Sequence, residues 1–423
     1  MKTIKRAGIF FSPMAKIMAP AGTFESLQAA IQAGADSVYF GVGKLNMRAR
    51  AAKTFTPKNL PAIVKICREK QVETYLTVNT IIYDDDASEM KKLIDTAKKA
   101  GVSALICCDS AVMKYAKQKG IPVHLSTQAN VSNIEAVAFY AHYADVVVLA
   151  RELSLQQIRN ICSEIKKRRI KGPSGKLVQI EVFVHGALCV SISGKCYMSL
   201  ALYNSSANRG ACLHTCRRKY RVFEEETGHE LVIDNNYVMS PKDLCTIGMI
   251  DKLIDAGVEV LKIEGRGRSP EYVSTTVKCY KEAVLAVEEG TYTKQKIRKW
   301  ETELSTVFNR GFWKNGYYLG KKLGEWAEGE GSNATMRKEH VGRVIHFWPK
   351  KMIAEFCLES GMVRTGDCYL VIGPTTGVVK GIVSRIIRNE KEVQEIGKGK
   401  TFTMKISEKV RVNDALYLLV EKR

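Results

Sequence analysis

Five of the twelve cysteines lie between residues 189 and 245, and they are Cys189, Cys196, Cys212, Cys216 and Cys245. Thiols grouped in this way can form disulfides, bind zinc, hold an iron–sulfur cluster or supply a nucleophile. The segment between them contains Gly194 and Gly210 together with several serines. Such residues are typical of looping backbone, which lets side chains from different points converge.

The spacing of these cysteines leaves the type of metal open. The interval between Cys189 and Cys196 is not the C-x-x-C of a zinc ribbon, and the set does not match a ferredoxin run. A cysteine nucleophile would need a histidine partner, and His185 and His214 are near only in sequence. Buried structural thiols remain an alternative, above all for the seven cysteines elsewhere.

The chain carries a large excess of positive charge. Its 423 residues contain 65 Lys and Arg against 44 Asp and Glu, a formal net charge of +21. Lys and Arg that displace counterions from phosphates give affinity for polyanions, so the charge indicates a nucleic-acid partner. The alternative is a basic surface without such a partner.

The sequence predicts a cytoplasmic protein that does not interact with membranes. It contains no apolar run of the ~18 residues that a spanning helix needs, and its first apolar stretch is broken by Pro13 and Lys16. Because the cytosol keeps thiols reduced, disulfides are disfavoured and a metal or cluster is favoured for the grouped cysteines.

A repeated pattern of a short apolar run, a loop and an amphipathic helix extends through residues 1–270. The expected strands are residues 16–20, 37–41, 73–79, 104–108, 122–127, 145–150, 178–184 and 259–265. Their Val, Ile and Leu content is typical of buried parallel strands. Eight such units predict an α/β fold, a (β/α)8 TIM-like barrel, with the cysteine segment as an insertion.

Polar residues follow the ends of the predicted strands, where active sites of such barrels lie. The positions of interest are Asn79, Gln128, Arg151, His185, Glu264 and Arg266. Each one alone could instead cap a loop or satisfy a buried hydrogen bond.

Two further regions follow the barrel. Residues 271–330 form a basic helical extension, in which residues 294–322 interleave Lys and Arg with Trp300, Phe308, Phe312, Trp313, Tyr317 and Tyr318. Such a mixture suits single-stranded nucleic acid, although the rings could equally pack the extension onto the barrel. The basic run at residues 166–176 could belong to the same surface. Residues 336–423 alternate like a small antiparallel β-barrel.

Several segments resemble one known family in order along the chain. EVFVHGALCVSISGKCYMS (181–199) is similar to the signature of the collagenase-like peptidase family U32. MAPAGTFESLQAAIQAGADSVYFG, LSTQANVSNIEAVAFY, ANRGACLHTCRRKY and KIEGRGRSPEYV also resemble family segments. The resemblance covers essentially the whole chain.

The resemblance implies RNA chemistry. Bacterial members similar to this chain are needed for 5-hydroxyuridine at the wobble position of tRNA, with prephenate as co-substrate, or for hydroxycytidine in ribosomal RNA. Related members of the ubiquinone pathway carry a 4Fe-4S cluster. The resemblance favours the tRNA branch, whose members this chain's length, C-terminal β-region and charge fit better than those of the other branches. Carried over by position, the cluster ligands would be Cys189, Cys196, one cysteine of the CLHTC pair, and Cys245. We prefer Cys212 to Cys216 from that pair, which leaves Cys216 as a spare thiol.

The remaining roles follow from charge and position. Residues expected to bind substrate, including a small dicarboxylate such as prephenate, are Arg48, Arg50, Asn79, Gln128, Arg151 and Arg266. Glu181, His185 and Glu264 are expected to handle protons. The alternatives to a tRNA hydroxylase are a peptidase, a ribosomal-RNA cytidine hydroxylase and an RNA-binding protein with structural zinc.

Overall fold

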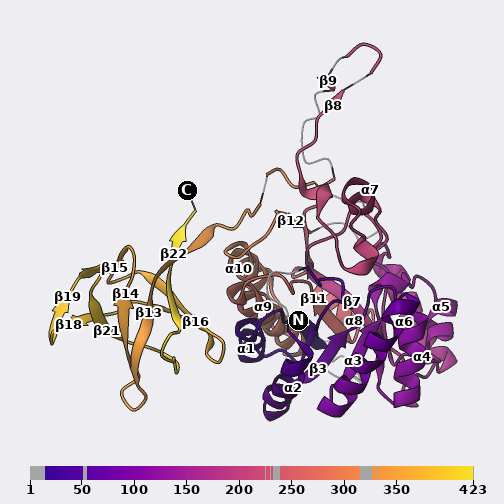
Figure 1. The fold of residues 1–423 in the computed structure, drawn as a ribbon, viewed down its shortest axis with the longest axis horizontal. Coiled ribbons are helices and arrows are strands. Elements are labelled where there is room, and N and C mark those ends of the chain that lie inside the picture. The colour runs from indigo at the N-terminus through magenta and orange to yellow at the C-terminus, as the bar shows by residue number, and fades with distance from the viewer. Residues whose placement is uncertain are drawn as a thin grey trace, which may run out of the picture.

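The computed structural model describes residues 15–50, 55–223, 225–228, 230–231, 239–314, 326–329 and 331–422. Figure 1 shows a large α/β body, a separate C-terminal β-region, and a segment that rises from one end of the α/β body near α7.

Eight parallel strands form the closed barrel that the sequence predicts. They are β1 (Lys16–Pro20), β2 (Ser37–Gly41), β3 (Glu73–Thr77), β4 (Ala104–Cys107), β5 (Val123–Leu125), β6 (Val146–Val148), β7 (Gln179–Gly186) and β11 (Val260–Ile263). Each strand from β1 to β7 pairs with the next, and β11 pairs with both β1 and β7, which closes the ring. All eight expected strands are confirmed.

Helices cover the outside of the barrel. They are α1 (Phe24–Gln32), α2 (Leu60–Glu69), α3 (Ala87–Ala100), α4 (Ser110–Lys119), α5 (Ile134–Tyr140), α6 (Leu155–Arg168), α8 (Ile250–Asp255) and α9 (Pro270–Glu288). The side chain of Thr23 caps α1 by accepting from the backbone N–H of Ser26. Gly101 and Gly120 end α3 and α4 in the left-handed conformation, with φ of 81° and 62°. Sequence-local caps therefore fix where these helices start and stop.

The cysteine segment is an insertion between the last two barrel strands. After β7 the chain forms α7 (Met198–Tyr203), β8 (Val222–Phe223) and β9 (Glu230–Leu231), and returns as β10 (Asp243–Cys245). β10 pairs antiparallel with the end of β7, so that Cys245 lies opposite His185. Because β7 leads directly into it, the insertion lies at the carboxyl ends of the barrel strands.

The helical extension packs on the barrel. This agrees with the alternative that its aromatic rings serve packing rather than nucleic-acid binding. After α9 it forms α10 (Lys294–Ser305) and β12 (Phe312–Trp313), which pairs with β10. Trp300 and Trp313 are buried in the same core as the barrel strands, and Phe308 packs against that core. These rings are therefore not free to stack on bases. Tyr317 and Tyr318 lie outside the described residues.

The basic run at residues 166–176 does not share a face with the insertion. It begins in the last turn of α6 and ends before β7 starts. A barrel helix runs antiparallel to its strands, so its carboxyl end lies at the amino ends of the strands. This run therefore sits at the end of the barrel opposite the insertion.

The C-terminal region is an antiparallel sheet structure with its own core. Its strands are β13 (Met336–Trp348), β14 (Ile353–Leu358), β15 (Met362–Arg364), β16 (Cys368–Gly373), β17 (Gly377–Ile382), β18 (Ile386–Arg388), β19 (Lys391–Val393), β20 (Glu395–Gly397), β21 (Thr401–Lys405) and β22 (Ala415–Glu421). It contacts the barrel where the Gln32 amide donates to the Thr376 carbonyl at 2.6 Å and Lys338 pairs with Glu271 at 2.9 Å. These contacts hold it against α1 and α9.

Within the part of the chain that the structure describes, we find no helix with both the length and the apolar character needed to span a bilayer.

Candidate active site at the mouth of the barrel

A cavity of about 670 Å³ opens at the carboxyl ends of the barrel strands, beneath the insertion. Its wall combines residues that follow β3, β5, β6 and β11 with residues of the insertion. All six residues that the sequence assigns to substrate binding line it, namely Arg48, Arg50, Asn79, Gln128, Arg151 and Arg266. Closure of the barrel brings these strand ends together, although they are far apart in sequence.

Four cysteines line the same cavity, and they are Cys189, Cys196, Cys212 and Cys216. None of these four is buried, and the backbone around them is mostly irregular. The backbone N–H of His214 donates to the Cys212 sulfur at 3.4 Å. The loop also depends on Gly210, which has a φ of 76° and approaches the Asn46 carbonyl so closely that a Cβ would clash. The insertion thus carries its thiols to the cavity on a constrained loop.

Cys245 lies apart from this group. It is buried on β10, and the Tyr280 hydroxyl of α9 donates to its sulfur at 4.0 Å. Burial raises the pKa of its thiol to about 11. Among the described residues, those that line the cavity include Cys216 and not Cys245. The structure therefore brings Cys216, and not Cys245, to the cavity with the other three thiols, because the Cys245 side chain on β10 faces Tyr280 of α9.

The four thiols surround the cavity without converging on one point. Within the described ranges, no three His, Cys, Asp or Glu side chains lie close enough together to hold a single metal ion. Cys216 is nevertheless near enough to the other three for each to influence its pKa, which burial raises and Arg217 partly lowers. The structure thus brings four sulfur donors to the wall of one cavity.

The cavity wall is strongly cationic. Among the described residues, the charged ones that line it are seven arginines, Lys262 and a single carboxylate, Glu264. Arg48 pairs with Glu264 at 2.7 Å. Burial raises the pKa of the Glu264 carboxyl, but Arg48 and Arg268 outweigh that effect and lower it to about 2. Glu264 is therefore ionised at neutral pH and a poor proton donor, which weakens the expected proton-handling role.

The arginines of the cavity wall differ in how many hydrogen bonds they donate to other protein groups. Arg266 donates to the hydroxyl of Thr77 at 2.5 Å and to Asn46 Oδ1 at 3.2 Å. Arg151 donates through Nη1 to the Ala187 carbonyl at 3.0 Å, while its buried Nε has no hydrogen-bond partner among the described residues. Arg151 also packs against the Phe183 ring, whose centre lies 3.9 Å from its guanidinium.

Glu181 and His185, which the sequence assigns to proton handling, do not line the cavity. Glu181 is fully buried in the barrel interior, where it pairs with Lys262 at 2.6 Å and with His124 at 3.4 Å. His185 faces α9, where the Tyr280 hydroxyl lies 3.3 Å from its Nδ1. Burial lowers the pKa of His185 to about 3, so the ring is neutral. Both residues belong to the framework that supports the site.

Several wall residues were not singled out from the sequence, and they are Tyr39, Arg217, Lys262, Arg268 and Arg310. Arg217 is a notable case, since it donates to the Pro241 carbonyl at 2.6 Å and to the Ser240 hydroxyl at 3.1 Å. It therefore ties the cysteine loop to the start of β10. The neighbouring motifs CRRKY and KIEGRGR hold three of these arginines or lysines and could have suggested them.

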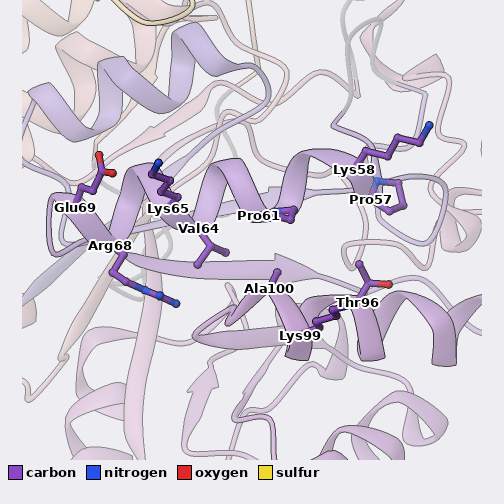
Figure 2. Close-up of a pocket in the computed structure, with 10 residues that line it drawn as sticks. All are labelled: Pro57, Lys58, Pro61, Val64, Lys65, Arg68, Glu69, Thr96, Lys99 and Ala100. Atoms are coloured by element: carbon purple, nitrogen blue, oxygen red, sulfur yellow. The ribbon is translucent and has the colours of Figure 1, made fainter.

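A second depression lies on the outside of the barrel, between α2 and α3 (Figure 2). It has a volume of about 810 Å³ and is lined by Pro61, Val64 and Ala100 with lysines and Arg68 around them. The described residues that line it include neither cysteine nor histidine. Its lining therefore lacks the thiols that line the cavity at the mouth of the barrel.

Comparison with known proteins places the chain among characterised sequences. The model of peptidase family U32 matches residues 22–328. A protein of Porphyromonas gingivalis named "Collagenase" is 54% identical over 95% of this chain and 97% of its own length. The "tRNA hydroxylation protein P1" of Bacillus subtilis is 31% identical over 70% of this chain and 69% of its own.

The name of a third relative refers to a different RNA, the 23S ribosomal RNA. The "23S rRNA 5-hydroxycytidine C2501 synthase" of Escherichia coli is 33% identical over 65% of this chain and 40% of its own length. The family match covers most of the chain, and the most similar of these relatives aligns over nearly its full length. This chain belongs to peptidase family U32.

Proposed function

We propose that this protein hydroxylates RNA and that its target is the wobble uridine of a tRNA, which becomes 5-hydroxyuridine. The observation that carries the proposal is the shared cavity, in which four thiols and a cationic wall face the same space at the mouth of the barrel. Relatives named as tRNA and 23S rRNA hydroxylation proteins, at 31% and 33% identity, support the class of reaction.

A 4Fe-4S cluster fits the sulfur donors. Four cysteine thiolates are the ordinary ligand set of such a cluster, which takes one at each iron and so needs them around a volume rather than at a point. Cys189, Cys196, Cys212 and Cys216 all line the one cavity, which supports this assignment. When bound, the cluster would supply electron transfer beside the substrate. The protein's own contribution is to hold the thiols and to surround them with positive charge.

Prephenate, or another small dicarboxylate, is the co-substrate that we propose for the arginine-lined part of the cavity. Arg151 lines the cavity, and its guanidinium is of the kind that donates to a carboxylate. Arg266 is held rigidly by Thr77 and Asn46, which prepares its position before a ligand arrives. Arg48 is already engaged by Glu264 and is the weaker candidate.

Nucleoside analysis of cellular RNA tests the proposal. RNA is isolated from a strain that lacks the gene and its paralogues, and its nucleosides are quantified by mass spectrometry. We expect hydroxyuridine-derived nucleosides of tRNA to be lost and to return with the parent gene or with Cys279→Ser, but not with Cys216→Ser. Unchanged tRNA nucleosides would contradict the proposal, and a loss confined to hydroxycytidine would move it to ribosomal RNA.

Peptide hydrolysis is the second candidate, because a relative of 54% identity bears the name collagenase. The site offers it little general-base chemistry. The cavity's one carboxylate is held by Arg48, and burial together with Arg48 lowers the pKa of His214 to about 4. Release of peptides from denatured collagen by the purified parent, abolished in Cys216→Ser, would establish this activity.

A further inference from the structure

We propose that the edge of the cavity is a stacking platform for unpaired nucleotides, so that the protein takes its RNA at a single-stranded loop. This inference rests on the proposed function and names the part of the RNA that the site receives. We define the mouth rim as Tyr83, Tyr197, Tyr203, Arg209 and Arg218. Tyr197, Arg209 and Arg218 directly neighbour residues that line the cavity. Tyr83 and Tyr203 lie against the guanidinium groups of Arg209 and Arg218.

The rim displays aromatic rings to solvent. Tyr197, Tyr83 and Tyr203 are 70%, 56% and 47% exposed, and Leu202 beside them is also exposed. Tyr197 directly follows the cavity residue Cys196. In Figure 1, α7, which ends at Tyr203, lies beside the base of the rising segment. Exposed rings grouped around one opening are expected where a partner is bound.

Two of the rings are paired with arginine planes. The guanidinium of Arg209 lies 4.1 Å from the centre of the Tyr83 ring, and that of Arg218 lies 5.1 Å from the centre of the Tyr203 ring. Arg209 is itself anchored, since it forms an ion pair with Asp86 and donates to the Ile81 carbonyl at 2.9 Å. Aromatic and guanidinium planes are the surfaces on which proteins stack unpaired bases.

The charge of the insertion specifies an anionic partner. From residue 189 to residue 221 it contains no Asp or Glu, and its basic residues are Lys195, Arg209, Arg217, Arg218, Lys219 and Arg221. Such a segment repels basic peptides and attracts phosphates. Its combination with exposed rings favours nucleic acid over an acidic protein surface, because bases have flat faces that tyrosine can cover.

The cavity behind the rim favours a single nucleotide at a time. Its volume of about 670 Å³ is that of a small-molecule site. A base inside a duplex cannot reach the wall without being unstacked and unpaired, whereas a loop base is already available. The rim would hold the neighbouring loop nucleotides while one base enters the cavity.

Binding of a hairpin RNA whose loop carries a fluorescent adenine analogue tests the rim directly and without catalysis. The purified full-length protein is titrated into this hairpin and into a blunt duplex of the same stem. We expect tighter binding of the hairpin, with fluorescence quenched by stacking. Tyr197→Ala and Tyr203→Ala should each weaken hairpin binding by about five-fold or more and relieve the quenching. Tyr197→Phe should retain both.

Phe139→Ala is the matched control, because Phe139 is 63% exposed on α5, outside the rim. It should bind like the parent. Equal hairpin binding by the parent and both alanine variants, equal binding of duplex and hairpin, or full displacement by polyglutamate without any quenching would each overturn the platform. If tRNA nucleosides still depend on the gene in that case, only this inference fails. If the protein binds no RNA and the nucleosides are unchanged, the proposed function fails as well.

Discussion

The cysteines at the mouth and those in the framework show how position decides what a thiol can do. Cys189, Cys196, Cys212 and Cys216 sit in the insertion with some exposure and face a common cavity. The framework cysteines are buried within regular elements, and they are Cys67, Cys107, Cys162, Cys245 and Cys279. The two groups have the same side chain, so the difference lies in burial and neighbours.

Burial makes the framework thiols chemically inert. It raises the pKa of Cys67 and of Cys162 to about 12, so both remain protonated at neutral pH. A protonated thiol is a poor nucleophile, because the thiolate is the reactive form. Cys245 resembles these residues in its burial and in its raised pKa.

Alkylation should separate the two groups almost completely. When the reduced, chelator-treated protein is exposed briefly to iodoacetamide, we expect modification of the four mouth cysteines and protection of the five framework cysteines until the protein is unfolded. Peptide mass spectrometry measures the modified fraction at each position. If Cys245 were alkylated as fast as Cys216 in the native protein, the proposed difference between mouth and framework cysteines would be wrong.

The framework should lose stability when its buried charges are separated. Glu181→Gln leaves Lys262 buried without its carboxylate, and we expect the free energy of unfolding to fall by about 3–5 kcal/mol. Urea denaturation measures the change. Asp255→Asn is the control, because it removes an exposed ion pair with Arg159 and should cost less than about 1 kcal/mol. Equal losses of unfolding free energy in the two variants would show that the buried Glu181–Lys262 pair contributes no more than an exposed pair.

The ion pair between Arg48 and Glu264 at the mouth should make the stability of the protein depend on pH. The pKa of Glu264 is about 2 in the folded protein and 4.5 unfolded, so its pairing stabilises the fold above pH 4.5 and that stability is lost as pH falls toward 2. In Arg48→Met the carboxyl should titrate nearer its usual pKa. We expect the stability gap between parent and variant to narrow by about 1–2 kcal/mol on acidification, measured by thermal unfolding at several pH values. A gap that stays constant would contradict the pairing.

Much of the framework could be predicted from the sequence, because its patterns are local. The eight apolar runs coincide with β1 to β7 and β11, and caps such as Thr23 and Gly101 fix the helix ends. The arginines of the cavity wall could also be predicted from the sequence. Residues that follow the strands of a closed barrel all lie at the same end of it. Arg151 and Arg266 come directly after β6 and β11 and line the cavity as expected.

The rest depended on long-range geometry. Which of Cys216 and Cys245 reaches the cavity depends on the path of the insertion and on the antiparallel pairing of β10 with β7. Glu181 and His185 are in the right strand, but one points into the barrel interior and the other toward α9. No spacing in the sequence distinguishes those directions from a direction into the cavity.

Metal analysis of the parent, Cys216→Ser and Cys245→Ser tests the central claim, that the four mouth thiols hold an iron–sulfur cluster. The three proteins are purified without oxygen and assayed for iron, sulfide, zinc and absorbance near ~400 nm. We predict about four iron and four sulfide per chain in the parent and in Cys245→Ser, and a loss of most of both in Cys216→Ser. A colourless parent that contains zinc, or a cluster that survives Cys216→Ser but is lost in Cys245→Ser, would contradict the account.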